Sequence, residues 1–515
     1  MFPAVMMLSQ TSPVQGASEH WKHHAVCSQP RVGHAYCHAL VIANQSGSPM
    51  ATTGPTGLGP STIDAVYGFP GQSTSGLGQT IAIVDAYNDP TAESDLSTFD
   101  TQYALPACTT ANGCFSKVNQ SGGTSYPATD SGWSLEISLD IQWAHAIAPG
   151  AKIMLVEANS NSFADLLAAE DYAKTHAQYV SNSWGGSEFT GENTYDAHFV
   201  QGGVSFFVAA GDAGLPAEYP SSSPNVISVG GTTLTFNQGG TLASETAWSS
   251  GGGGCSAVET ANVAQSSFAQ YGQANCGGRR ATPDVSLDAD PNSGVAVYDS
   301  TPYSGQSGWF QVGGTSASTP MWAGAAADAG VIVNAAYVYG NNITFRDITS
   351  GNNGASCLTG FDLCSGRGSW LFGSGTTTTT STSSTTSTTS TTSTTSTTST
   401  TSTTSTTSTT STTTTSTTTT TLANGPAVPT NLVATTPRFG RISLSWSEAT
   451  SGVTFNLYRG VGPGNESSTP VRTGITSTTM RDSNLTSGVQ YCYRVAAVKN
   501  SVVSAKSNEA CAVAR

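Results

Sequence analysis

The segment Gly313-Gly-Thr-Ser-Ala-Ser-Thr-Pro320 leads directly into a run of small residues, Met321-Trp-Ala-Gly-Ala-Ala-Ala-Asp-Ala-Gly330. The paired glycines allow a tight turn, and a proline is preset for the first turn of a helix. We therefore expect a turn followed by a helix near 318–333, with Ser316 at the junction. The N-terminus of that helix would favour negative charge developing at Ser316. The segment predicts a serine nucleophile, and an ordinary helix-capping serine is the alternative.

A serine nucleophile needs a base within hydrogen-bond reach. The Gly-His-Gly-Thr-His motif that supplies a histidine base in subtilisins is absent. Residues 134–148 instead have a helical pattern that Pro149 ends. Glu136 and Asp140 lie four residues apart on it and so share one face. Two carboxyls held this close tend to share a proton, so one has a raised pKa and can orient the other.

The residues around this acidic pair are apolar, which argues against the alternative of a solvated acidic helix face. They are Leu135, Ile137, Leu139 and Ile141. His145, nine residues past Glu136, is expected to be a packed helix residue rather than a base.

Two further segments follow predicted buried strands. Val208-Ala-Ala-Gly-Asp-Ala-Gly214 ends a strand in an acid between glycines, Asp212. An acid donates a hydrogen bond to an oxyanion only when it is protonated, so such a donor would fail as the pH rises. A simple turn aspartate is the alternative. Ser181-Asn-Ser-Trp-Gly-Gly186 follows another strand, where backbone groups can pair with an extended peptide as an added strand.

The Glu-x-x-x-Asp helix before an Ala-Pro-Gly-Ala turn, combined with the later Gly-Thr-Ser-x-x-x-Pro segment, resembles the sedolisin family of serine-carboxyl peptidases. The resemblance covers residues 60–373 and implies a subtilisin-like fold. It implies that Glu136 is the base acting on Ser316 and that Asp140 supports Glu136. It places Asp212 in the oxyanion hole. By the same resemblance the substrate-binding edge comprises Ser183, Trp184 and Gly185.

Asp85 follows the predicted strand 80–84, where subtilisins carry the aspartate of their triad. Because no suitable histidine follows it in the sequence, we expect Asp85 to be structural or at most a supporting acid.

Two later segments, Phe345-Arg-Asp-Ile-Thr-Ser-Gly-Asn-Asn-Gly354 and Gly360-Phe-Asp-Leu-Cys364, are rich in oxygen donors of the kind that suits Ca²⁺. The pattern resembles the calcium site of sedolisins. That resemblance implies ligation by the side chains of Asp347 and Asp362 and by main-chain oxygens of Ile348, Leu358 and Gly360. The intervening loop is short for the family and contains the Cys357/Cys364 pair, a departure that bears most on Leu358.

Apolar runs at 80–84, 152–156, 179–183 and 204–210 are typical of buried parallel strands. Helical patterns near 92–103, 134–148, 163–176 and 318–333 lie between or after them. This alternation predicts an α/β fold over residues 60–373, a subtilisin-like parallel sheet flanked by helices. Catalytic residues in such folds gather at the carboxyl ends of the strands.

A nearly pure Thr/Ser tract at 376–421 has no apolar residues to bury, so we expect a disordered linker over 374–426. Short alternating strands follow at 442–446, 454–458 and 491–497. They predict a small all-β, immunoglobulin-like sandwich over 427–515. This part resembles a fibronectin type III domain through Pro429, Trp446, Tyr458, Leu485, Tyr491, Ser504 and Ser507. It contains no catalytic constellation, so its expected role is spacing or adhesion, with polysaccharide or matrix as candidate ligands.

The 515-residue chain carries 18 basic and 32 acidic residues, a net charge of −14. This balance argues against nucleic acid or an anionic membrane as a partner, because both need a basic face. It suits a protein that works in acid, although an acidic surface that only maintains solubility is the alternative. No apolar run approaches the roughly 20 residues that span a bilayer.

Ten cysteines form five sequence-local pairs, which fits loop-closing disulfides and an oxidising compartment. The pairs are Cys27/Cys37, Cys108/Cys114, Cys255/Cys276, Cys357/Cys364 and Cys492/Cys511. With the linker, they predict a secreted protein, although the apolar start at 1–8 lacks the basic region of a signal peptide. Within the N-terminal segment 1–59, the stretch 27–42 is either a reduced pro-segment or part of the domain.

We therefore expect a secreted, monomeric, acid-active endopeptidase that acts on proteins or peptides and binds Ca²⁺. An adhesion or matrix-binding protein with an inert peptidase-like domain is the main alternative. It is less favoured because all four chemical positions are filled. A subtilisin-type Asp/His/Ser enzyme is disfavoured by the missing histidine motif.

Overall fold

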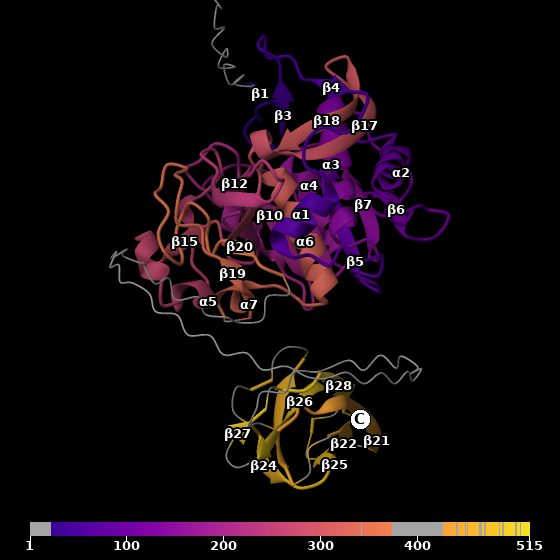
Figure 1. The fold of residues 1–515 in the computed structure, drawn as a ribbon, viewed down its shortest axis with the longest axis vertical. Coiled ribbons are helices and arrows are strands. Elements are labelled where there is room, and N and C mark those ends of the chain that lie inside the picture. The colour runs from indigo at the N-terminus through magenta and orange to yellow at the C-terminus, as the bar shows by residue number, and fades with distance from the viewer. Residues whose placement is uncertain are drawn as a thin grey trace, which may run out of the picture. The chain divides into compact units, whose positions relative to one another are not determined.

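The computed structural model describes residues 22–372 except 341, and residues 426–514 with short gaps at 439–440, 449, 451, 463–465, 468–469, 484, 487–488, 500–501 and 505 (Figure 1). The chain divides into two compact units on either side of residue 381. The predicted linker, apart from residue 426, and the apolar start at 1–8 lie outside the described residues.

An eight-stranded sheet forms the centre of the first unit. Its order is β13-β12-β10-β8-β5-β7-β6, and β16 also pairs with β12. Every pairing is parallel except that of β13 with β12. The strands are β5 (Thr80–Ala86), β6 (Phe115–Asn119), β7 (Lys152–Ala158), β8 (Tyr179–Asn182), β10 (Ser205–Ala209), β12 (Ile227–Phe236), β13 (Leu242–Ala247) and β16 (Val285–Asp288). The predicted parallel sheet is confirmed.

Helices α3 (Ser131–Ile147), α4 (Phe163–Ala173) and α6 (Thr315–Ala329) pack against this sheet. The other helices of the unit are α1 (Pro60–Tyr67), which contacts α3, α2 (Ala92–Tyr103), which contacts α3 and β17, and the short α5 (Val263–Ser266) and α7 (Ala335–Tyr339), which contact each other. Helix α3 is buried almost all round because it packs on α6, β5 and β17. Its first turn is capped by the Asp130 side chain, which accepts the N–H groups of Gly132 and Trp133.

Residues 22–59 belong structurally to this first unit. β1 (Lys22–Ala25) pairs with β3 (Leu40–Ala43), and β3 and β4 (Ala51–Thr52) both pair with β18 (Gln306–Gly313). β18 in turn pairs with β17 (Val295–Tyr303). A separate three-stranded sheet has the order β11 (Glu218–Tyr219), β9 (Trp184–Ser187) and β2 (Tyr36–Cys37). Two short pairs complete the unit: β14 (Gly254–Thr260) with β15 (Arg279–Thr282), and β19 (Phe345–Arg346) with β20 (Ser369–Trp370).

The second unit is an antiparallel sandwich, as predicted. One sheet holds β21 (Thr430–Arg438), β22 (Arg441–Ser447) and β25 (Thr479–Ser483). The other holds β24 (Arg472–Ile475), β23 (Thr454–Val461), β26 (Gln490–Lys499), β27 (Val502–Val503) and β28 (Ala510–Val513). Trp446, Leu457 and Tyr493 are among the buried residues of its core.

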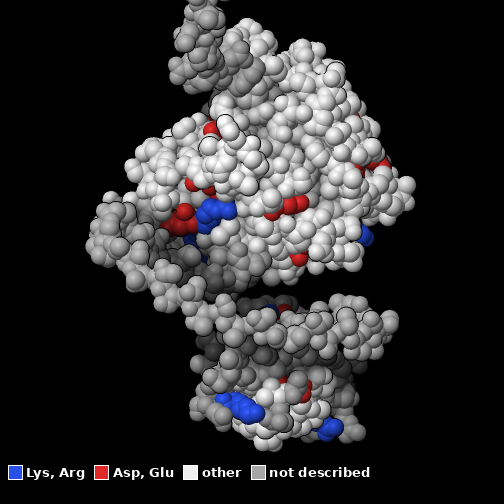
Figure 2. Space-filling view, viewed as in Figure 1, with Lys and Arg blue, Asp and Glu red and all other residues white. Residues whose placement is uncertain are grey.

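All five predicted cysteine pairs form disulfides. None of the helices in the described residues has the length and apolar character needed to cross a membrane. On the face in Figure 2 the described surface is mostly uncharged, with scattered acidic and basic side chains. Many acids are instead buried in the first unit, among them Asp85, Glu136, Asp140, Glu157, Glu170, Asp288 and Asp299.

Candidate active site

The predicted nucleophile lies where strand β18 passes into helix α6. Gly314 joins them with a φ of +98°, a conformation that residues with a side chain rarely adopt. A Cβ atom there would collide with the main-chain oxygen of His38 and with Oδ2 of Asp212. Ser316 is therefore fixed in the first turn of α6, fully buried, with its Oγ donating to the Ser183 carbonyl at 3.2 Å.

Helix α6 begins three residues earlier than predicted, which corrects the expected place of Pro320. This proline lies inside the helix rather than in its first turn. Because proline has no N–H, the carbonyl of Ser316, four residues earlier, receives no helical hydrogen bond from it. The Ser183 hydroxyl lies 3.5 Å from that carbonyl. The proline thus frees a polar group beside the nucleophile.

The predicted acidic pair lies on helix α3, which packs against α6. Glu136 and Asp140 are both fully buried. Oδ1 of Asp140 accepts the hydroxyl of Ser183 at 3.0 Å. Within the described residues, Oδ2 of Asp140 and both oxygens of Glu136 have no hydrogen-bond partner. Two carboxyls without cationic partners in such a place are expected to share a proton.

Burial raises the pKa of Glu136 well above its usual range, and the charges of Asp140, Asp85 and Asp212 raise it further. The Ser316 hydroxyl acts in the opposite direction. Burial also raises the pKa of Asp140, which its bond from Ser183 partly opposes. Burial and the charge of Asp140 also raise the pKa of Asp85, so the protonation of each of these three buried acids depends on the other two.

The Ser316 hydroxyl lies near Glu136 as well as near the Ser183 carbonyl. The Ser316 hydroxyl lies close enough to affect the pKa of Glu136, yet its hydrogen bond goes to Ser183. Rotation about the Cα–Cβ bond of Ser316 would turn this hydroxyl away from the Ser183 carbonyl. Apo sites commonly show such loose catalytic contacts.

Asp212 contacts the turn that carries the nucleophile, through Thr315. Its Oδ1 accepts the N–H of Thr315 at 2.8 Å and the Thr315 hydroxyl at 2.9 Å. Its Oδ2 is shielded from solvent and has no partner among the described residues. Burial raises the pKa of Asp212 to about 8, with the Thr315 bonds opposing and the Glu218 charge adding. A proton on Asp212 therefore belongs on Oδ2, because Oδ1 already accepts two donors.

Of the predicted substrate edge, Trp184 and Gly185 lie in β9 and Ser183 directly precedes that strand. Trp184 is buried, and its indole Nε1 donates to the Val84 carbonyl at 2.8 Å. The strand is already paired on both sides, with β11 on one and with β2, from the N-terminal segment, on the other. A segment of the chain itself thus occupies the edge where we expected a peptide.

Other residues gain a defined place as well. Asp85 is fully buried near Glu136 and Asp140, as a supporting acid would be. His145 is packed as expected, with Nε2 2.9 Å from the Pro106 carbonyl, and burial lowers its pKa to about 4. Sequence reasoning missed His38 and Glu218, which lie beside this site. Neither belongs to a motif, and the Cys27–Cys37 disulfide closes a loop within the N-terminal segment only.

The two predicted calcium-binding carboxylates converge on the loop between the Cys357 and Cys364 half-cystines. Both oxygens of Asp347 accept the N–H of Gly360, at 3.1 and 2.9 Å. Asp362 accepts the N–H of Leu358 at 2.7 Å and further donors at Cys364 and Ser365. The exposed carboxylate of Asp347 and the buried carboxylate of Asp362 thus face one loop. The N–H groups of Leu358 and Gly360, rather than their carbonyls, now face these oxygens, and Ile348 is buried beside them.

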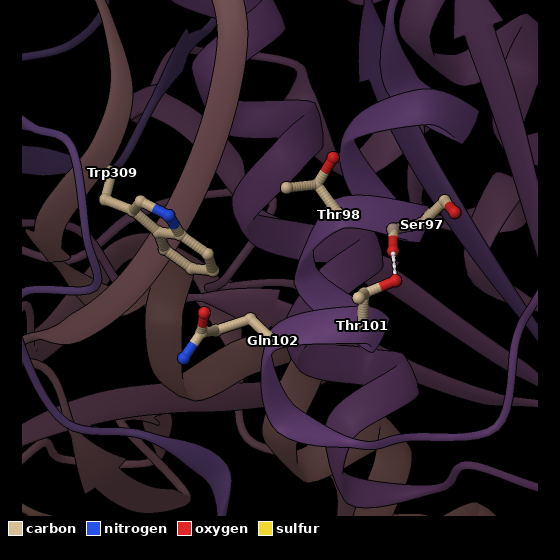
Figure 3. Close-up of a pocket in the computed structure, with 5 residues that line it drawn as sticks. All are labelled: Ser97, Thr98, Thr101, Gln102 and Trp309. Atoms are coloured by element: carbon tan, nitrogen blue, oxygen red, sulfur yellow. Dashed lines mark hydrogen bonds between the residues drawn. The ribbon is translucent and has the colours of Figure 1, made fainter.

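A hollow of about 380 Å³ lies elsewhere on the first unit (Figure 3). It is lined by Ser97, Thr98, Thr101 and Gln102 of α2 and by Trp309 of β18. The hydroxyl of Thr101 donates to the Ser97 carbonyl at 2.8 Å, as helix residues four apart commonly do. With no titratable side chain in its lining, this hollow offers no acid–base chemistry.

The comparisons with known proteins agree with this geometry. The model of the subtilase family matches residues 127–330, which contain α3, Asp212 and Ser316. Kumamolisin from Bacillus sp. (strain MN-32) is 30% identical over 376 residues, covering 63% of this chain and 63% of kumamolisin. The solved structure of Pseudomonas sedolisin, a serine-carboxyl proteinase, is 27% identical with a TM-score of 0.52, covering 61% of this chain and 96% of that one. The first unit is thus similar to peptidases of the sedolisin family.

The similarity to a serine-carboxyl proteinase supports a serine-type peptidase. The chain spans less than two thirds of kumamolisin's own length. An Fn3-like protein from Clostridium thermocellum, 33% identical, covers 17% of this chain and 92% of that one, with a TM-score of 0.16.

Proposed function

We propose that the first unit is an acid-active serine-carboxyl endopeptidase that hydrolyses peptide bonds through an acyl-enzyme on Ser316. The observation that carries the proposal is the placement of a buried serine, in the first turn of α6, against a buried acid pair on α3. The alternative to a catalytic pair, a solvated acidic helix face, would leave these carboxyls exposed. Both are inaccessible to solvent instead.

The first step is attack of Ser316 Oγ on the scissile carbonyl carbon while Glu136 takes the hydroxyl proton. Asp140 shares a proton with Glu136 and holds it in place, and the Ser183 hydroxyl orients Asp140. The negative charge on the carbonyl oxygen is met by the main-chain N–H of Ser316 and by the proton on Asp212 Oδ2. The leaving amine takes the proton from Glu136, and water then releases the acyl group.

The pH range follows from these groups. Asp212 can donate only while protonated, and its pKa is raised to about 8. The donor is therefore present through acidic and neutral pH and is lost as the pH rises above about 8. We expect activity to be highest on the acidic side of neutrality, because the buried acids of α3 also retain a shared proton there.

Calcium has a structural role in this proposal. Asp347 and Asp362 would hold the ion by side chain, with main-chain oxygens of Ile348, Leu358 and Gly360 completing the site. Bound Ca²⁺ would neutralise the two carboxylates, of which Asp362 is buried, and tie β19 to the loop that follows it. The ion has no part in the peptide hydrolysis.

We also infer that the protein acts outside the cell, in keeping with its five disulfides. The sandwich unit would serve as a spacing or adhesion module for the peptidase. Its ligand class, polysaccharide or matrix, and the monomeric state of the protein are further parts of the proposal.

The experiment that tests the function is digestion of casein from pH 2 to pH 9 by the wild type and by Ser316→Ala. We expect acid digestion by the wild type and none by the variant. Ser94→Ala, an exposed hydroxyl on α2, is the control and should match the wild type. A wild type that leaves casein intact at every pH would favour the inert adhesion protein.

A further inference from the structure

The ammonium group of Lys117, on β6, lies at the end of the central sheet and uses all three of its N–H donors. It lies 2.9 Å from Oε1 of Glu157 on β7, an oxygen that also accepts the N–H of Asp89 at 3.0 Å. It donates to Oδ1 of Asn88 and to the Asp89 carbonyl, each at 2.6 Å. The side chain is 13% exposed, and the ammonium lies 4.5 Å from the centre of the Tyr126 ring. Because an ammonium has three donors, this lysine is held in one place, unlike a solvated surface lysine.

The pairing of the strands places Lys117 in a row with the catalytic acids. Asp85 on β5 is the partner of Glu157, and Lys117 is the partner of Leu155, two residues before Glu157 on β7. Partner residues in parallel strands, and every second residue along a strand, point to the same face of a sheet. Lys117, Glu157 and Asp85 therefore share a face. The charge of Asp85 acts on Glu136, so this is the face that α3 covers.

The loop that follows β5, residues 87–90, joins the same lysine to helix α3. The Ser134 hydroxyl donates to the Asn88 carbonyl at 3.4 Å, and the Ser138 hydroxyl donates to Oδ2 of Asp89 at 3.4 Å. Ser134 and Ser138 lie one turn apart on α3, two residues before and two residues after Glu136. The two loop residues that accept hydrogen bonds from the lysine thus also contact the part of α3 that carries the catalytic base.

Lys117 supplies a positive charge at one end of this row of acids. Burial raises the pKa of Glu157 to about 7, and the charge of Lys117 opposes this rise. Burial also raises the pKa of Asp89 to about 6, with Lys117 among the groups that oppose it. Within the described residues, neither Asp85 nor the acid pair of α3 forms an ion pair. A positive charge nearby favours the ionised form of a carboxyl, so Lys117 makes it easier for the row to hold one negative charge.

The other titratable groups around the row are mostly acids. They are Asp212, which faces Glu136; Asp95 and Asp299, which face Asp89; Glu93, which lines the same hollow as Lys117; Tyr126; and His145, which faces Asp100 from α3. Burial lowers the pKa of His145 to about 4, so this histidine is neutral over most of the pH range. Lys117 is therefore the member of this set that stays positively charged at every pH of interest.

We infer that Lys117 is a positioning residue of the peptidase, which holds the 87–90 loop and Glu157 in place beside α3 and whose charge helps Glu136 to be the carboxylate that receives the Ser316 proton. The inference rests on the proposed function, because it concerns how the base of that reaction is kept ready. Lys117 takes no part in the bond changes. The proton still passes from Ser316 Oγ to Glu136.

The first test compares Lys117→Ala with the wild type on a peptide from the casein digest, as kcat and KM between pH 2 and pH 7. Without the positive charge the acid pair keeps its proton to higher pH, so the acidic limb of the kcat profile should move upward by about 0.5–1 pH unit. On that limb kcat should fall about three- to tenfold, with KM unchanged. Lys152→Ala removes an exposed lysine at the start of β7 and is the control that should keep the wild-type profile.

Chemical rescue separates the charge of Lys117 from its packing. The side chain borders a hollow of about 370 Å³, through which a small molecule can reach the space that Lys117→Ala leaves. n-Propylammonium has the three carbons and the ammonium that this variant lacks, and it should move the acidic limb back toward that of the wild type. n-Propanol, which is uncharged and of the same size, should not, and neither compound should move the limb of the wild type. Equal rescue by the two compounds would overturn the role of the charge.

Lys117→Arg keeps the charge and should keep the acidic limb of the wild type. A limb that n-propylammonium does not restore, and that Lys117→Arg shifts as far as Lys117→Ala does, would assign the effect to side-chain shape and overturn the inference. Lys117→Met, which keeps most of the aliphatic stem, replaces Lys117→Ala in the kcat comparison if that variant does not fold. Failure of both uncharged variants to fold would make Lys117 a residue of the fold alone, which also contradicts the inference.

The outcomes separate this inference from the proposed function. A wild type that digests casein in acid, together with a Lys117→Ala variant of identical kcat profile, would overturn the inference alone. A wild type that leaves casein intact at every pH would overturn the proposed function, and the inference with it.

Discussion

The main-chain carbonyl of Ser183 accepts the hydroxyl of Ser316 at 3.2 Å, and the side chain of Ser183 donates to Asp140 at 3.0 Å. One residue thus contacts the nucleophile through its backbone and the acid pair through its hydroxyl. It also receives the N–H of His38 on that same carbonyl. Ser183 therefore contacts the nucleophile, the acid pair and the backbone of the N-terminal segment.

Removing the Ser183 hydroxyl should alter the acid pair without removing the nucleophile. The bond from Ser183 lowers the pKa of Asp140, so Ser183→Ala raises it. The pair then holds its proton to higher pH, and the acidic limb of the kcat profile moves upward, with kcat reduced by about tenfold, the order expected for a positioning hydrogen bond worth about 1.4 kcal/mol. Ser181→Ala is the matched control, because that buried hydroxyl on β8 has no partner among the described residues. Identical profiles for the two variants would contradict the role given to Ser183.

Deprotonation of Asp212, the proposed oxyanion donor, should cause the fall in kcat on the alkaline side of the pH profile. The pKa of Asp212 is raised to about 8, so about one tenth of the donor remains protonated at pH 9. Asp212→Asn donates at any pH and should lose this limb, whereas Asp212→Ala should lose about 10²–10³-fold in kcat at all pH values. Initial rates of peptide hydrolysis between pH 5 and pH 9 measure both effects. An alkaline limb that Asp212→Asn leaves in place would assign it to another group.

Thermal stability should fall as the pH rises. Burial raises the pKa of Glu170 to about 8 and that of Asp299 to about 9, well above their unfolded values. Folding thus binds protons between about pH 4 and these values, and the stabilisation is lost as the pH rises through that window. The buried His38 and His145, with pKa values lowered to about 3 and 4, act oppositely below pH 6.5. Because more acids than histidines are shifted, the Tm at pH 5 should exceed that at pH 8. Calorimetry of Ser316→Ala measures this without self-digestion, and a higher Tm at pH 8 would be the contrary result.

Calcium should stabilise the first unit. Ca²⁺ binding to the folded state alone raises the Tm by mass action, and removal of the ion with EDTA reverses it. The variant Asp347→Asn should lose most of this response because one ligating carboxylate is gone. Asp171→Asn, on an exposed carboxylate of α4, is the control and should respond as the wild type does. A wild-type Tm that does not change with Ca²⁺ or EDTA would remove the metal from the account.

The sequence was sufficient for the features that local chemistry determines. The alternating strands and helices predicted the parallel sheet, and the spacing of Glu136 and Asp140 predicted their common face. The short loops between cysteines predicted all five disulfides. Pro320 was misplaced because α6 begins at Thr315 and continues across this proline while packed on the sheet. His38 and Glu218 could not be predicted, because neither belongs to a motif and only the fold brings β2 and β11 beside β9.

The central claim is that a carboxylate, Glu136, draws the proton from Ser316. Rapid-quench mass spectrometry of the enzyme with a peptide substrate at pH 4 measures formation of the acyl adduct on Ser316. The account predicts that Glu136→Gln slows this step by about 10²–10⁴-fold, the range of general base catalysis. Glu170→Gln, which also replaces a fully buried glutamate of raised pKa, should form the adduct at the wild-type rate. Adduct formation at an undiminished rate in Glu136→Gln would contradict the account.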